Sequence, residues 1–175
     1  MSDNDPGRSL PAFLAHAVAL ERESAERYRE LADVMSVHHN PGAAALFARL
    51  AELGELHAGQ VEARARGLTL PSIPPWLYQW PAAEAPETGP HEETHYLMTR
   101  LEVLRYALAN EQRGLDFYAG LARGASEAEV RTLAAEFERE ETHHVEVLRA
   151  WIDRALTDGG DGPTPEDPDP PNLPE

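Results

Sequence analysis

Residues 20–32 read LERESAERYRELA, and residues 110–122 read NEQRGLDFYAGLA. Both stretches contain many residues that favour helices, and in each of them a glutamate precedes a tyrosine by seven residues. The two pairs are Glu21 with Tyr28 and Glu111 with Tyr118. A histidine follows on the next predicted helix in both cases. We interpret the two stretches as equivalent parts of an internal repeat.

Proline and glycine divide the chain around these stretches, because neither residue is tolerated cheaply inside a helix. One helical hairpin is predicted at about 11–37 and 41–67, and a second at about 93–123 and 126–156. Six prolines between residues 68 and 92 predict a long irregular crossover. The predicted fold is therefore an all-α four-helix bundle of two hairpins joined by a proline-rich crossover.

The length of 175 residues, 42% of them hydrophobic, suits one domain. We assign the bundle to residues 10–156, after a flexible N-terminus at 1–9. Residues 157–175 are acidic and rich in proline, which predicts a disordered tail because such a segment buries too little apolar surface to offset its ordering entropy. The aromatic residues of the crossover, Trp76, Tyr78 and Trp80, are expected to cover the bundle or a second subunit, and we expect a homodimer.

Composition excludes several classes of function. The chain has no cysteine, which rules out disulfides and thiolate metal sites. A formal net charge of -16 disfavours nucleic acids and anionic membranes as partners. The sequence has no apolar run long enough to span a membrane and no signal-peptide pattern at its start, so a cytoplasmic protein is expected.

Five titratable residues interrupt the apolar seams of the four predicted helices at similar depth. They are Glu21, His57, Glu111, Glu141 and His144. Burial of an unpartnered carboxylate costs several kcal/mol, and the chain contains no lysine to neutralise one. A pair of metal ions is the economical partner, although arginine or the tyrosines Tyr28 and Tyr118 could pair with the carboxylates instead.

Taken together, the paired Glu-x6-Tyr segments, the Glu141-Glu-Thr-His144 segment, the crossover and the repeat resemble the rubrerythrin branch of the ferritin-like diiron proteins. The resemblance covers roughly residues 10 to 156. It implies that Glu21 and Glu111 are the single carboxylate ligands of the first and third helices. His57 matches the histidine of the second helix, and Glu141 with His144 matches the Glu-x-x-His of the fourth.

Two positions depart from the family pattern. The second helix should carry a glutamate three residues before His57, where this chain has Gly54. A second glutamate often follows in the third helix, where this chain has Gly114. We expect Gln60 or a water molecule to take the place left at Gly54, and a glutamate introduced there to restore a ligand and strengthen the helix.

The resemblance implies two iron ions, with manganese or zinc as alternatives, and an oxidoreductase that reduces peroxide or O2. Glu21, Glu111 and Glu141 would be the catalytic carboxylates, shifting between bridging and terminal binding. A full rubrerythrin carries a rubredoxin domain with two Cys-x-x-Cys motifs, which this chain lacks, so electrons would come from a separate donor. The alternative function is a non-catalytic metal-binding or structural bundle with a degenerate site.

Overall fold

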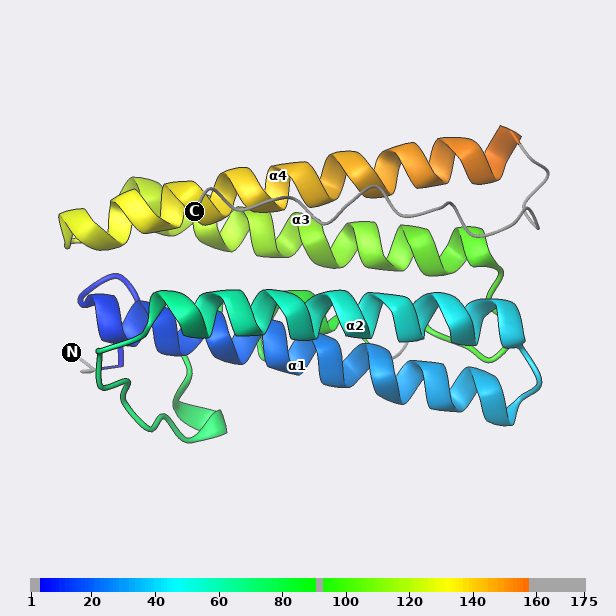
Figure 1. Ribbon diagram of the computed structural model, residues 1–175, viewed down its shortest axis with the longest axis horizontal. Helices are drawn as coiled ribbons and strands as arrows, with labels where there is room; N and C mark the ends of the chain where they lie inside the picture. The colour runs from blue at the N-terminus through cyan, green and yellow to red at the C-terminus, as the bar shows by residue number, and fades with distance from the viewer. Residues whose placement is uncertain (1–3, 91–92, 158–175) are drawn as a thin grey trace.

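The computed structural model describes residues 4–90 and 93–157, which form four long helices (Figure 1). In the described part of the connection between the second and third helices lie two single-turn 3-10 helices. The elements are α1 Leu10–Val37, α2 Pro41–Arg64, η1 Pro75–Leu77, η2 Pro86–Thr88, α3 Arg100–Gly124 and α4 Ala128–Thr157. No β-strand occurs among the described residues, as predicted.

The helices pack as two antiparallel hairpins, α1 against α2 and α3 against α4, laid side by side (Figure 1). This arrangement confirms the predicted four-helix bundle. The apolar core is split into two clusters, one around Phe47 and Trp151 and one around Phe13 and Phe137. The polar residues that interrupt the seams belong to neither cluster.

Side-chain caps set the helix starts. Ser9 accepts a hydrogen bond from the backbone of Ala12, and Thr99 forms a capping box with Glu102. Because of this capping box, α3 begins at Arg100 rather than near residue 93, and the connection from α2 is longer than the proline pattern alone indicates.

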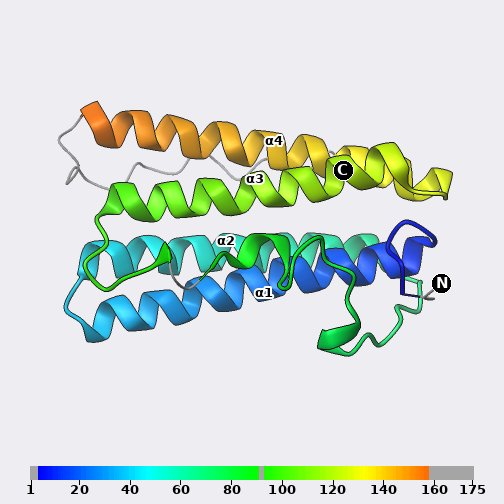
Figure 2. The ribbon, with the colours of Figure 1, turned by 180° about the vertical axis from the view of Figure 1, so that it is seen from behind.

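The crossover passes close to α1 (Figure 2), and His16 of α1 attaches it to this helix. Its Nδ1 atom donates to the carbonyl oxygen of Ala12, and its Nε2 atom accepts from the backbone amide of Gln79. The rings of Tyr78 and Trp80 pack edge-on against the fully buried imidazole. These two aromatic residues therefore cover the bundle, whereas Trp76 is 81% exposed.

The N-terminal residues that are described lie against the connection between α3 and α4, where the carbonyl oxygen of Gly7 accepts hydrogen bonds from Ser126. Beyond Thr157, the predicted tail lies outside the described residues. None of the described helices is long and apolar enough to cross a membrane.

Candidate metal centre

All five site residues predicted from the seams converge between the two hairpins. Glu21 lies on α1, His57 on α2, Glu111 on α3, and Glu141 and His144 on α4. The Nδ1 atom of His144 donates to Glu111 Oε2 at 3.1 Å and to Glu141 Oε2 at 3.2 Å. Across the bundle, His57 Nδ1 lies 3.7 Å from Glu21 Oε2. The helices thus bring together three carboxylates and two imidazoles.

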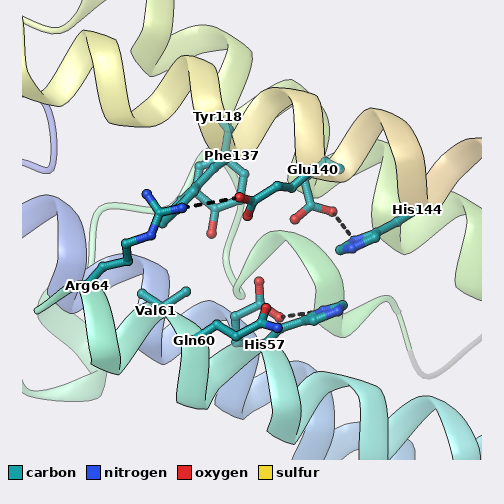
Figure 3. Close-up of a pocket in the computed structure, with 10 residues that line it drawn as sticks. His57, Gln60, Val61, Arg64, Tyr118, Phe137, Glu140 and His144 are labelled. Atoms are coloured by element: carbon teal, nitrogen blue, oxygen red, sulfur yellow. Dashed lines mark hydrogen bonds and ion pairs between the residues drawn. The ribbon is translucent and has the colours of Figure 1, made fainter. Parts of the chain in front are cut away.

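The two histidines face each other across the boundary between the hairpins (Figure 3). Their rings are stacked, with 4.4 Å between centroids and an interplanar angle of 2°. Each ring lies beside a carboxylate of its own hairpin, His57 beside Glu21 and His144 beside Glu141. The site therefore has two halves, one in each hairpin.

A sixth residue, Glu87, joins the site from the crossover. It is only 3% exposed, and one oxygen of its carboxylate, Oε1, has no hydrogen-bond partner. Seam analysis missed it because η2 is an irregular segment without helical periodicity. The hint in the sequence is Gly114, where a glutamate was expected. In the structure, a Cβ atom on this glycine would overlap the carboxylate of Glu87.

The six residues contain two groups that could each hold a metal ion. Within each group, one ligand atom of every member lies within 4.8 Å of the others. The groups are Glu111, Glu141 and His144, and Glu21, Glu87 and Glu141. Glu141 belongs to both, which is the position expected of a carboxylate between two ions.

A small cavity opens from the site between α2 and α4. Its volume is about 20 Å³, enough for about one water molecule. Its lining includes Tyr118, whose hydroxyl group is buried and has no hydrogen-bond partner in the protein. Arg64 also lines the cavity, where it lies above the ring of Phe137 and 3.6 Å from Glu140 (Figure 3). It forms a further ion pair with Glu136 at 2.7 Å.

Comparison with solved structures identifies a related protein. It is a crystal structure from Magnetospirillum magnetotacticum MS-1 described as COG1633, an uncharacterized conserved protein. The two sequences are 40% identical, the match covers 91% of this chain and 99% of that chain, and the TM-score is 0.63. This chain belongs to the COG1633 family. A scan against protein-family models and a search of curated proteins found no match.

Buried carboxylates dominate the electrostatics of this COG1633 protein. Burial raises the pKa of Glu141 to about 7, although His144 acts in the opposite direction. Burial and the charges of Glu141 and Glu111 raise the pKa of Glu21 well above its usual value. Burial and the charge of Glu21 also raise the pKa of Glu87 well above its usual value. The site therefore needs positive charge before all its carboxylates can ionise.

The pKa values of the two histidines shift in opposite directions. Burial lowers the pKa of His57 to about 4, which leaves a neutral ring of the kind that binds metals. His144 is buried too, but the charge of Glu141 and its hydrogen bonds with Glu111 and Glu141 raise its pKa well above the usual value. A proton on His144 thus lies between the carboxylates of Glu111 and Glu141.

Gly54 of the COG1633 chain has a packing role that sequence reasoning missed. The glycine is buried, and a Cβ atom there would lie 3.0 Å from Ala25 Cβ and 3.3 Å from Ala25 Cα. The missing side chain thus permits close approach of α2 to α1. The contact with Ala25 thus offers a packing explanation for the glycine, beside the expectation that the missing side chain leaves an open ligand position that glutamate could fill.

We expect Gly54→Glu to lower the free energy of unfolding by about 1–3 kcal/mol, because the added atoms overpack the α1–α2 contact. Gly59 provides the matched control, since it lies on α2 with no atom within 4 Å of an added Cβ. Gly59→Ala should stabilise the protein by up to about 1 kcal/mol. Urea denaturation of both variants measures the difference, and an equal gain in both would refute the packing explanation.

Proposed function

We propose that this protein holds two metal ions, with iron as the natural pair, and uses them to reduce peroxide or O2. The observation that supports this proposal best is the shared ligand Glu141 at the junction of two carboxylate groups. Four buried or half-buried carboxylates, Glu21, Glu87, Glu111 and Glu141, carry four negative charges when ionised. Two divalent ions would balance them.

The donor set fits iron or manganese. Carboxylate oxygens with a minority of imidazole nitrogens are the ligands that these metals accept in helical bundles. The Oε1 atom of Glu87 and the Tyr118 hydroxyl group are buried without partners in the protein, which is costly unless something else binds them. Membership of the COG1633 family and the ferritin-like arrangement of the helices support a diiron centre of this kind.

The proposed reaction is the two-electron reduction of a small oxidant. For peroxide, the O–O bond breaks and two electrons and two protons convert the molecule into two molecules of water. Bound iron would supply the electrons, which a separate electron-transfer partner restores. The cavity lined by Tyr118 has a volume of about 20 Å³, which suits a molecule of about the size of water or peroxide.

Anaerobic loading with Fe(II) tests the proposal. We expect about two irons per chain and consumption of peroxide when a reductant is present. Glu111→Gln should lower the rate by at least about 10-fold, because it removes a ligand. Glu52→Gln, an exposed change on α2, should leave the rate unchanged. One ion per chain without turnover would favour the structural alternative, for which Glu111, Glu141 and His144 alone form a compact site.

A further inference from the structure

The segment that carries Glu87 is held firmly on both sides of this residue. The 3-10 turn η2 packs against α1 and α3. Two backbone carbonyl groups of η2 and that of the following residue, Gly89, accept hydrogen bonds from side chains of these helices. Arg113 Nε donates to Pro86 O at 2.7 Å, Tyr106 Oη to Thr88 O at 2.9 Å, and Arg27 Nη1 to Gly89 O at 3.3 Å.

Gly89 permits this close approach. Its φ angle is +54°, a region that favours glycine. A Cβ atom there would lie 2.6 Å from both Asn110 Oδ1 and Tyr106 Oη. Glycine at position 89 therefore allows the crossover to bring η2 into close contact with α1 and α3.

The carboxylate of Glu87 forms few stabilising contacts with the rest of the protein. Ser24 forms a hydrogen bond with it, while the Oε1 atom has no partner. The carboxylates of Glu21 and Glu141 each offer an oxygen within 4.8 Å of it, and the charge of Glu111 also acts on it. An ionised carboxylate without a partner destabilises the fold in such a place, so this carboxylate is neutralised either by a proton, as its raised pKa indicates, or by a cation between the three residues.

Gly114 supplies the space for this carboxylate. It lies three residues after Glu111 and therefore on the same face of α3. Any side chain at this position would collide with Glu87 Oε1. The volume that a side chain of α3 would fill is thus occupied by a carboxylate that comes from the crossover.

We propose that Glu87 is a metal ligand, supplied by the crossover in place of a carboxylate on α3, and that bound metal fastens the crossover to the bundle. This inference rests on the proposed metal centre and adds a ligand from outside the four helices. Because η2 is held through backbone contacts, Glu87 reaches the ion without rearrangement. Bound metal is then expected to slow amide hydrogen exchange in the η2 segment as well as in the helices.

Titration with Mn(II), followed by calorimetry, tests the ligand role. Glu87→Gln is expected to weaken binding at least about 10-fold at one position. Gly114→Ala keeps every ligand but displaces the Glu87 carboxylate, so it should weaken the same position. Glu84→Gln is the matched control, because Glu84 lies on the crossover with an exposed side chain, and it should bind Mn(II) as the parent does.

A swap variant separates ligation from a general effect on folding. Glu87→Ala combined with Gly114→Glu moves the carboxylate from the crossover to α3 and should regain most of the lost affinity. Amide hydrogen exchange supplies a second measurement. In the parent, Mn(II) should slow exchange in residues 84–90, whereas in the swap variant it should slow exchange in α3 but not in this segment.

The outcomes separate this inference from the proposed function. If the parent binds two Mn(II) ions and both Glu87→Gln and Gly114→Ala bind them equally well, Glu87 is not a ligand, while the dinuclear centre stands. If the parent binds no Mn(II), the metal centre itself is wrong and the role of Glu87 falls with it. Should Glu87→Gln fail to fold, Gly114→Ala decides the question alone.

Discussion

Glu141→Gln is expected to weaken metal binding at both positions of the centre by at least about 100-fold, the largest effect of any single substitution. Glu141 is the residue that the two ligand groups share, so its loss removes one donor from each ion. Removal of residues that merely support ligands already costs 10- to 100-fold in affinity. Mn(II) or Co(II) titration of the metal-free variant measures the effect.

Glu146→Gln is the control for this substitution. Glu146 lies on α4, five residues after Glu141, and is exposed, so the same chemical change there should leave both affinities intact. If Glu141→Gln weakens only one of two binding steps, Glu141 belongs to a single ion. The two groups would then be independent.

The metal-free Glu141→Gln protein should be no less stable than its parent at pH 8. Burial raises the pKa of Glu141 to about 7, so at pH 8 the parent must keep a charge in a site that disfavours it. A neutral amide avoids this cost. Loss of metal binding together with retained stability would exclude unfolding as the cause.

The helix-borne part of the site could be predicted from the sequence because its residues follow a period. Glu21, Glu111 and Glu141 lie where leucine or alanine should recur on a buried helix face, and a charged residue at such a position stands out. The same reasoning placed His57 and His144. Their convergence between the hairpins follows from the fold, because each residue lies near the middle of its helix.

The periodic pattern of the helices could not predict the roles of Glu87 and Gly54. The crossover has no period, so nothing in its own residues indicates that Glu87 rather than Glu84 points inward. At Gly54 the family pattern suggested an absent ligand, whereas contact with Ala25 explains the glycine through packing between helices. Both depend on distances between segments that are remote in sequence. The residue that leaves space for Glu87 is Gly114, which lies on α3 and not on the crossover.

Stability of the metal-free protein should fall as pH rises above about 6.5. Glu21, Glu87 and Glu141 have raised pKa values, so the folded protein keeps protons that the unfolded chain releases near pH 4.5. Their stabilising contribution is complete below that pH and is lost as pH rises through the folded values, near 7 for Glu141. His144, whose pKa is also raised, adds to the loss above pH 6.5.

Below pH 6.5 two histidines oppose this trend. Burial lowers the pKa values of His57 and His16, so their contribution is present above pH 6.5 and is lost as pH falls. The two effects partly cancel between about pH 4.5 and 6.5. Above that range only the loss remains, at about 1.4 kcal/mol per pH unit for each extra proton held by the folded state.

Metal should reverse this pH dependence, because ligands bind the ion in their deprotonated forms and the affinity therefore rises with pH. Urea denaturation between pH 5.5 and 8.5, with EDTA and then with excess Mn(II), measures both trends. We expect the EDTA series to lose stability above pH 6.5 and the Mn(II) series to keep or gain it. Glu141→Gln should flatten the EDTA series, because it removes one of the titrating groups. A metal-free parent whose stability is constant from pH 6.5 to 8.5 would show that these carboxylates are not buried together, and the metal centre would lose its physical basis.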